Sequence, residues 1–292
     1  ITANLVRIKF SRSKIAPEWA RHFLRSEFFQ KALEDATSAT TIKTIQVPEL
    51  CAIKFWRPPI EEQRRIAEIL DTIDEAIQKT EALISKLKAM KQGLLHDLLT
   101  RGLDKNGKLR DPKAHPEQFK DSPLGRIPNE WDVINLGDSF EELYRYPTYY
   151  GIMYVNYGVP EVRGELIKKD GTMEENTAAY RYINRETADR FPRVHLEPGD
   201  FVMSVRGTMG KIAIVPERLR GAVITANLIR MKFAKSVIVS KWAHHFLRSA
   251  FFQDALDLAT SATTIKTIQV SQLCSIPFRR PLVDEQIRIA DI

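Results

Sequence analysis

A short basic stretch, Ser204–Lys211 (SVRGTMGK), places two cationic side chains around a turn that contains two glycines. Arg206 can form two parallel hydrogen bonds with guanine or contact a phosphate, and glycine lets the backbone approach a groove of a duplex. We assign Ser204, Thr208 and Lys211 to the same candidate contact, since hydroxyls and ammonium groups bond to phosphate oxygens. The alternative is a plain hairpin turn with a solvated arginine.

A second candidate is a loop rich in hydroxyl side chains that occurs twice. Thr260–Thr267 (TSATTIKT) has the same sequence as Thr37–Thr44. Hydroxyls and a lysine suit contacts with the phosphate backbone, which position a protein without reading the sequence. The candidate contacts in the two loops are Thr263, Thr264, Lys266, Thr41 and Lys43. The alternative is a structural loop that packs on a helix.

All eight tyrosines of the chain lie between Tyr144 and Tyr182, interleaved with basic residues that include Arg145 and Arg181. Tyrosine offers a rigid ring and a hydroxyl that can bond to a base or a phosphate. We predict a recognition surface here, although some of these tyrosines must pack in the core. The side chains assigned to DNA binding in this region are Tyr146, Tyr149, Tyr150 and Arg163.

Common motifs of catalysis and metal binding are absent from the sequence. There is no GxxxxGK[ST] phosphate loop, HExxH, paired CxxC or GxSxG. The neighbours His244 and His245 align with Arg21 and His22 of a repeat described below, so this pair varies and a metal site is not predicted. We therefore expect no catalytic residue and no metal ligand in this chain.

The composition is typical of a soluble cytoplasmic protein, with 43% hydrophobic and 28% charged residues. A net charge of +7 is compatible with a polyanionic partner. No apolar run is long enough to span a membrane, and no leader opens the chain. The two cysteines, Cys51 and Cys274, are distant in sequence and indicate small buried residues in a reducing compartment.

An internal repeat organises the chain. Residues 1–69 align with residues 224–292 without a gap at a constant offset of 223, and 46 of the 69 positions are identical. Because this period is too long for a solenoid, it indicates two copies of a whole domain. The first copy begins inside its domain and the second ends where a helix has only begun. We therefore expect a fragment of a longer duplicated protein.

The stretch from Pro59 to Leu99 predicts one long helix. Apolar or small residues recur three or four apart, the spacing of a coiled-coil seam. About 40 residues at 1.5 Å each give a helix of about 60 Å, whose apolar stripe needs a partner. The residues predicted for helix packing or partner docking are Ile66, Leu70, Ile73, Ile77, Ile84, Leu87, Leu94 and Leu98. Since the second such helix only begins at Asp284, most of this stripe should be exposed, or covered only by that short helix and another chain.

Each copy of the repeat predicts a strand, a helix, a loop and further strand structure. Residues 1–10 alternate as in a strand, and an amphipathic helix follows from Pro17, which suits the first helical turn. Residues 42–53 predict a strand or strand pair that Pro48 interrupts. The second copy repeats this order, with its strand at residues 223–233 and its helix at residues 240–258.

Between the copies, a polar segment punctuated by glycine and proline predicts a linker, and a new domain opens near Trp131. The short strands expected in it cover residues 133–136, 154–162, 165–167, 201–205 and 211–215. The fold class is therefore α+β. Its predicted parts are the C-terminal part of a first domain (1–58), a long spacer helix (59–100), the linker (101–127), a second domain (128–283) and the start of a second spacer helix (284–292).

Three motifs on this duplicated frame resemble the specificity subunit of a type I restriction-modification system. They are the exit into a long helix at Pro58–Ala67, the domain opening at Asp121–Asp138 and the stretch Gly199–Val215. The resemblance covers essentially the whole chain. It implies two target recognition domains, each of which reads one part of a bipartite site in double-stranded DNA.

The resemblance also implies partners. The long helices would pack antiparallel as a spacer and dock two methyltransferase subunits, and restriction subunits would complete the nuclease. S-adenosylmethionine, ATP and Mg²⁺ would belong to those partners, which leaves this chain a non-catalytic recognition subunit without a cofactor. Two alternatives stay open: the recognition end of a fused restriction-methylation enzyme, and a coiled-coil scaffold protein with no role on DNA.

Overall fold

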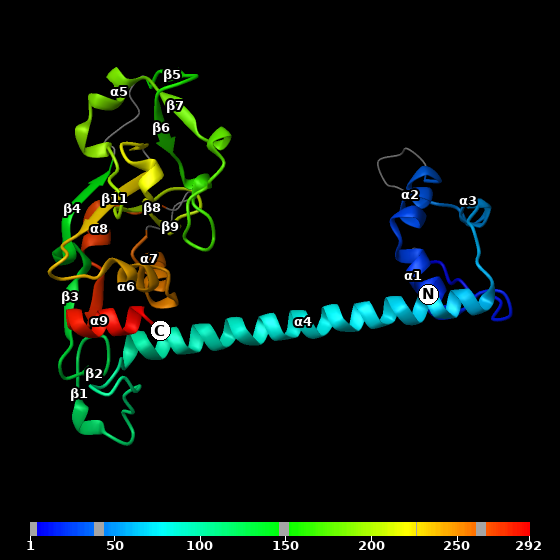
Figure 1. The fold of residues 1–292 in the computed structure, drawn as a ribbon, viewed down its shortest axis with the longest axis horizontal. Coiled ribbons are helices and arrows are strands. Elements are labelled where there is room, and N and C mark those ends of the chain that lie inside the picture. Colours follow the sequence, from blue (N-terminus) through cyan, green and yellow to red (C-terminus); the bar gives the residue numbers. More distant parts are fainter. Residues whose placement is uncertain (1–4, 38–43, 146–151, 226, 261–266) are drawn as a thin grey trace. The chain divides into compact units, whose positions relative to one another are not determined.

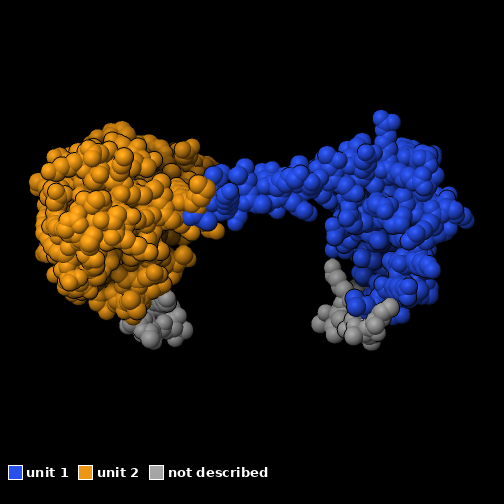
Figure 2. Space-filling view, turned by 90° about the horizontal axis from the view of Figure 1, so that it is seen from below, with its two compact units in different colours: residues 1–89 blue, residues 90–292 orange. Residues whose placement is uncertain are grey.

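The computed structural model describes residues 5–37, 44–145, 152–225, 227–260 and 267–292. The chain divides into two compact units, residues 1–89 (unit 1) and residues 90–292 (unit 2), which Figure 2 colours separately. Helix α4 (Ile60–Thr100) contributes its residues 60–89 to unit 1 and its residues 90–100 to unit 2. The long helix predicted from the apolar spacing is therefore present.

Unit 1 contains three short helices before α4, namely α1 (Pro17–Arg25), α2 (Glu27–Asp35) and α3 (Val47–Ala52). Its buried core joins α1 to the beginning of α4 through Trp19, Ala20 and Ala67. Pro17 occupies the first turn of α1, as the sequence predicted, because proline lacks only a donor that is unpaired there anyway.

The amphipathic helix predicted in each copy is broken into two. In unit 1 the break is at Ser26, whose hydroxyl donates to the carbonyl of Phe23 (2.7 Å) and accepts from the amide of Phe29 (3.3 Å). In unit 2, Ser249 divides α6 (Ser240–Leu247) from α7 (Ala250–Leu258) in the same way. A serine that bonds to the backbone on both sides ends one helix and caps the next.

Two strand predictions for the repeat are wrong. Residues 5–10 form no strand, whereas the equivalent residues of unit 2 form β11 (Leu228–Phe233) between β4 and β8. Residues 44–53 contain α3 in place of a strand, and their counterpart contains α8 (Val270–Cys274). Pro48 fits the first turn of α3, and the Glu49 carboxylate accepts from the amide of Gln46 (2.9 Å), so local bonds favour the helix.

Unit 2 holds the α+β fold, with two four-stranded sheets (Figure 1). The first sheet is antiparallel and has the order β4 (Phe140–Arg145), β11, β8 (Phe201–Ser204) and β9 (Ile212–Ile214). The second sheet has the order β10 (Val223–Ile224), β6 (Val159–Val162), β7 (Arg181–Ile183) and β5 (Tyr154–Val155). The strands predicted at residues 201–205 and 211–215 are confirmed as the β8–β9 hairpin.

Smaller elements complete unit 2. Two short antiparallel pairs join β1 (Phe119–Lys120) to β2 (Ile127–Pro128) and β3 (Asp132–Asn135) to β12 (Pro277–Arg280). The other α-helices are α5 (Arg185–Asp189) and α9 (Val283–Ala290). Short 3₁₀ helices span Pro116–Gln118, Leu136–Ser139, Gly164–Leu166, Thr177–Ala179, Pro192–Val194 and Glu217–Leu219. The strand predicted at residues 165–167 is wrong, because a turn bond from the Leu166 amide to the Arg163 carbonyl (3.0 Å) begins a 3₁₀ helix there.

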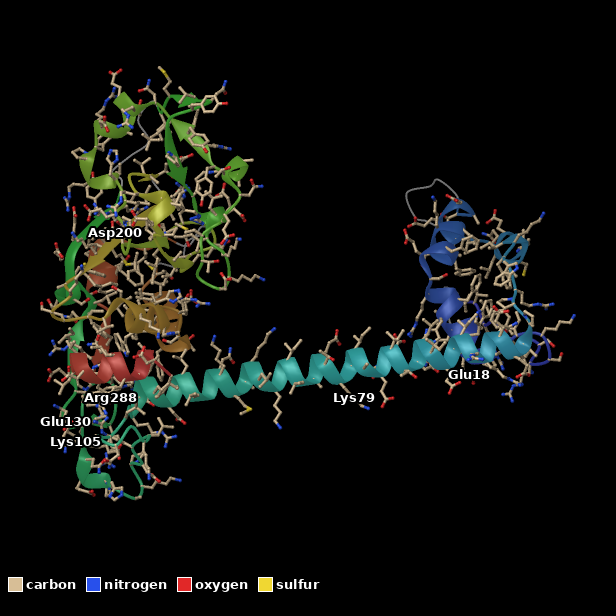
Figure 3. The ribbon with its side chains drawn as sticks, viewed as in Figure 1. Glu18, Lys79, Lys105, Glu130, Asp200 and Arg288 are labelled. Carbon is tan, nitrogen blue, oxygen red and sulfur yellow. The ribbon has the colours of Figure 1, made fainter. Side chains whose placement is uncertain are left out.

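The segment predicted as a linker lies within unit 2 and packs against α9. The buried Glu285 carboxylate accepts from the amide of Leu103 (2.8 Å), from the guanidinium of Arg110 (2.6 Å) and from the indole of Trp131 (2.9 Å). Arg288 donates to the carbonyl of Asp104 (2.6 Å), and Figure 3 shows Arg288 beside the segment that carries Lys105 and Glu130. These bonds fix residues 101–131 against the base of α9.

Candidate nucleic-acid interface

The loop of the β8–β9 hairpin has the turn geometry that the sequence predicted. Gly207 and Gly210 have positive φ angles of 76° and 77°, which disfavour any residue with a Cβ. The buried hydroxyl of Ser204 donates to the carbonyl of Thr208 (2.6 Å) and accepts from the amide of Lys211 (3.0 Å). Ser204 therefore shapes the loop from inside, while Arg206 and Thr208 are exposed.

This loop is fastened to two neighbouring elements. The amide of Gln253 on α7 donates to the carbonyls of Gly210 (3.1 Å) and Leu247 (2.8 Å). On the other side, the ammonium group of Lys211 donates to the carbonyl of Gly164 (3.2 Å). Lys211 thus ties the hairpin to the end of β6, and the anchored loop presents Arg206 in a restricted position.

Arg206 lies next to a second arginine, Arg145 at the end of β4. Arg145 donates to the carbonyl of Ile268 (3.2 Å), and Arg206 forms an isolated β-bridge with Thr267. Partial burial lowers the pKa of Arg145, and the positive charge of Arg206 lowers it further. Within the described ranges, neither guanidinium forms an ion pair with a carboxylate.

Three stretches that the sequence singled out therefore meet at this point of unit 2. Arg145 precedes the tyrosines at residues 146–150, Arg206 belongs to the hairpin loop, and Thr267 ends the hydroxyl loop. The strand order β4-β11-β8 brings the first two together, and Arg145 reaches over to the end of the third. Eight predicted contacts lie outside the described residues: Tyr146, Tyr149, Tyr150, Thr263, Thr264, Lys266, Thr41 and Lys43.

Arg163 is placed differently from Arg206. Its side chain is about one-fifth exposed, and its guanidinium donates to Glu165 and to the carbonyl of Ala179 (3.0 Å). A second carboxylate, that of Glu161, lies 3.8 Å from its Nε atom. The charge of Arg163 is thus balanced within the protein.

The described tyrosines divide into core and surface. Tyr180 is buried, and its hydroxyl donates to the carbonyl of Glu174 (2.6 Å). Tyr144 is half-buried beneath the guanidinium of Arg193, at 4.5 Å from the ring centroid. Tyr154 and Tyr157 are exposed. The described tyrosines are therefore partly core residues and partly exposed ones, and their role in recognition stays a prediction.

The predicted helix stripe is exposed along most of its length. Five residues of the stripe are each between 42% and 53% exposed, namely Ile73, Ile77, Ile84, Leu87 and Leu94. Burying these apolar side chains against a partner would be favourable. Ile66 and Leu70 are half-buried. Leu98 is buried in the main core of unit 2, where Ile289 and Ala290 of α9 also lie.

The described residues contain no group of three or more His, Cys, Asp or Glu side chains arranged to hold a metal ion. Nor does any helix in the described part of the chain combine the length and the apolar composition needed to cross a membrane.

Comparisons with known proteins match this arrangement. Residues 7–89 match the model of the type I restriction modification DNA specificity domain. The chain is 25% identical over 298 residues to the EcoBI specificity subunit of Escherichia coli, which covers 99% of the chain and 60% of that protein. It is 24% identical over 263 residues to the MjaVIII specificity subunit of Methanocaldococcus jannaschii. This alignment covers 89% of the chain and 59% of that protein. The chain is thus similar to type I restriction specificity subunits along most of its length, and its residues 7–89 match the DNA specificity domain.

Solved structures of this group share the fold. One, from a study of complex assembly and conformational transition in a type I system, has a TM-score of 0.57 at 20% identity and covers 97% of this chain and 64% of that one. The S subunit of a type I system from M. genitalium has a TM-score of 0.50 at 14% identity, with 96% and 66% covered. The chain thus spans less than two thirds of the length of its curated relatives.

Sequence patterns predict a contact for Arg206 but assign no separate role to Arg145 and Arg181. In the sequence both stand only as basic residues among the tyrosines. Their positions depend on strand pairing between residues far apart in the chain, such as Arg145 with Ile229 and Arg181 with Glu161. Basic residues at strand ends within an aromatic region are the one sequence signal that marks them.

Proposed function

We propose that unit 2 binds double-stranded DNA and reads part of a target sequence, as the recognition component of a type I restriction-modification complex. The observation that carries this proposal is the pair of neighbouring guanidinium groups, Arg145 and Arg206, without a carboxylate partner among the described residues. Two adjacent cations repel each other in the free protein, and a phosphate or the acceptor edge of guanine relieves that repulsion. The similarity to specificity subunits supports the same assignment.

In this proposal the contacts have two classes. Arg206, in an exposed loop outside the repeat, is assigned to base reading. The hydroxyl loops, which are identical in the two copies, are assigned to phosphate oxygens. Contacts that two recognition domains share cannot distinguish the different DNA sequences that the domains read. Phosphate contacts then supply most of the affinity. The tyrosines at residues 146–150, which lie outside the described residues, are assigned to the same interface, and each recognition domain reads one part of a bipartite site.

The exposed stripe of α4 is assigned to partners. We propose that it packs against a second long helix and docks two methyltransferase subunits, which restriction subunits join. S-adenosylmethionine, ATP and Mg²⁺ belong to those partners, and this chain contributes recognition without a catalytic step. Such a complex acts on DNA in the cytoplasm. Adding or removing one turn of α4 in the assembled complex is expected to change the spacing between the two half-sites and leave their sequences unchanged.

Fluorescence anisotropy with the full chain tests the DNA assignment. A preferred duplex is first selected from a randomised library, and its affinity is compared with that of a scrambled duplex. Arg206→Ala is expected to weaken the preferred duplex about 10- to 100-fold and the scrambled duplex less, since a bidentate contact to guanine is sequence-specific. Arg220→Ala is the matched control, because Arg220 is an exposed arginine paired with Glu217.

Two results would count against this assignment. Equal losses for both duplexes in Arg206→Ala would make Arg206 a backbone contact. If the wild-type chain selects no duplex and binds none even at low salt, the DNA assignment of unit 2 is wrong.

A further inference from the structure

A second exposed arginine is held on an aromatic ring in the small sheet of unit 2. Arg181 lies on β7, and its guanidinium carbon is 5.6 Å from the centroid of the Tyr154 ring on the edge strand β5. Such a cation–π contact restricts a side chain that is otherwise among the most flexible. Arg181 itself is exposed, so its hydrogen-bonding edge is available to a partner.

A buried carboxylate, that of Glu161, bonds to the tyrosine of this stack. Glu161 lies directly opposite Arg181 in the β6–β7 register and is 2% exposed. The hydroxyl of Tyr154 donates to Oε1 of Glu161 (3.2 Å), while Oε2 has no hydrogen bond in the part of the chain that the structure describes. Glu161 thus fixes the ring on which Arg181 rests. Burial raises the pKa of Glu161, and the positive charges of Arg163 and Arg181 oppose that shift by favouring its ionised form.

The stack adjoins the candidate interface. Residue Gly164, two positions beyond the end of β6, accepts a hydrogen bond from Lys211 at the end of the Arg206 loop (3.2 Å). A Cβ at Gly164 would lie 3.6 Å from the side chain of Ser204. The strand that carries Glu161 therefore runs directly toward the hairpin loop, and both exposed arginines belong to adjoining parts of unit 2.

We propose that Arg181 is a second base-reading residue, which selects a G·C pair, and that Tyr154 and Glu161 are its positioning residues. This inference rests on the proposed binding of DNA by unit 2. Guanine offers two acceptors that match the fork of a fixed guanidinium, whereas a phosphate contact needs no such fixing. Arg181 also lies in the part of the chain outside the repeat, where two recognition domains are free to differ.

Selection from a randomised duplex library, with the full chain and each variant, tests this inference. The wild-type chain is expected to yield a motif that contains at least one preferred G·C pair. Arg181→Ala and Arg181→Lys are both expected to reduce the preference at one such pair about 10- to 100-fold and to leave the other positions unchanged. Lysine keeps the charge but lacks the fork, so equal losses in the two variants identify bidentate reading.

Variants of the support separate positioning from folding. Tyr154→Phe keeps the ring and removes the bond to Glu161, and Glu161→Gln removes the negative charge. Each is expected to weaken the preference at the same base pair as Arg181→Ala, with a smaller effect, while thermal unfolding shows that both variants remain folded at the assay temperature. Arg190→Ala, at another exposed arginine of unit 2, is the control and should keep the wild-type motif.

Three outcomes would overturn the inference. An unchanged motif in Arg181→Ala, with a salt dependence lower by about one phosphate contact, would make Arg181 a backbone contact. An unchanged motif and unchanged affinity would remove Arg181 from the interface, and if Arg206→Ala still changed the motif, the proposed function would stand alone. If the wild-type chain selected no motif, the proposed function and this inference would both fail.

Discussion

The two copies of the repeat form the same helices but differ in their strands and in what covers the start of the long helix. Residues 228–233 form β11 because β4 and β8 pair with it on both sides, whereas residues 5–10, nearly identical in sequence, form no strand. The helices α1 and α2 match α6 and α7. A helix makes its hydrogen bonds within itself, whereas a strand needs partners from elsewhere in the chain, so equal sequences give equal helices and unequal strands.

The helix starts show the same contrast at single residues. Gln63 and Gln286 are equivalent and bond alike: each accepts from a backbone amide, Ala16 or Val239, at 2.8 Å. The preceding glutamates differ, since Glu62 is exposed and Glu285 is buried with Arg110. The glutamine thus bonds to residues of its own copy of the repeat in both units. The glutamate of unit 2, by contrast, is buried by residues 101–131, which have no counterpart in unit 1.

The largest expected effect is at Glu285. Glu285→Ala leaves the buried guanidinium of Arg110 without its main partner, and we expect unit 2 to lose about 3–5 kcal/mol of unfolding free energy. Urea unfolding of the full chain, with hydrogen exchange of peptides from each unit, measures this. Glu62→Ala is the matched control and should leave unit 1 unchanged. Equal losses at the two positions would contradict the difference between the copies.

A smaller loss of unfolding free energy, equal in the two units, is expected when Gln63 or Gln286 is replaced. Gln63→Ala and Gln286→Ala each remove three hydrogen bonds that tie the helix start to the preceding chain. Because buried backbone groups lose their partners, we expect each change to cost about 2–3 kcal/mol in its own unit. The same hydrogen-exchange experiment measures both. A loss confined to one unit would show that the two helix starts are held differently.

The smallest effect concerns pH, and it should be confined to unit 2. Burial, together with the positive charges of Arg248 and His245, lowers the pKa of His244 to about 4, against the opposing effects of the Gly171 backbone and the Asp170 carboxylate. The folded pKa is below the unfolded value of about 6.5, so this contribution is complete above pH 6.5 and is lost as the pH falls toward 4. We expect unit 2 to lose about 1–2 kcal/mol of unfolding free energy over this pH range, after allowance for the exposed part of the His244 ring.

Scanning calorimetry at pH 7 and pH 4.5 measures this effect. His244→Gln should reduce the pH dependence of the unit 2 transition. The equivalent residue of unit 1 is Arg21, which does not titrate in this range. An unchanged pH dependence in His244→Gln would assign it to other groups.

Local features of this molecule could be predicted from sequence, and non-local ones could not. Proline at the first helical turn, the glycine-bounded hairpin at Arg206 and the long apolar stripe of α4 each follow from spacing within a few residues. The Glu285 contact with Arg110 joins residues 175 positions apart, and the meeting of Arg145 with Ile268 spans 123. Pro48 shows a local error as well, since proline marks a strand break and a helix start equally well.

The most direct test of the central claim is hydrogen exchange of the full chain with and without its selected duplex. DNA is expected to slow exchange in peptides that contain Arg145, Arg206 and Thr267, which belong to the three segments that meet at the candidate interface. Peptides from residues 101–131, which pack against α9, should be unaffected. Protection of residues 101–131 with none around Arg206 would contradict the assignment of DNA binding to the Arg206 surface.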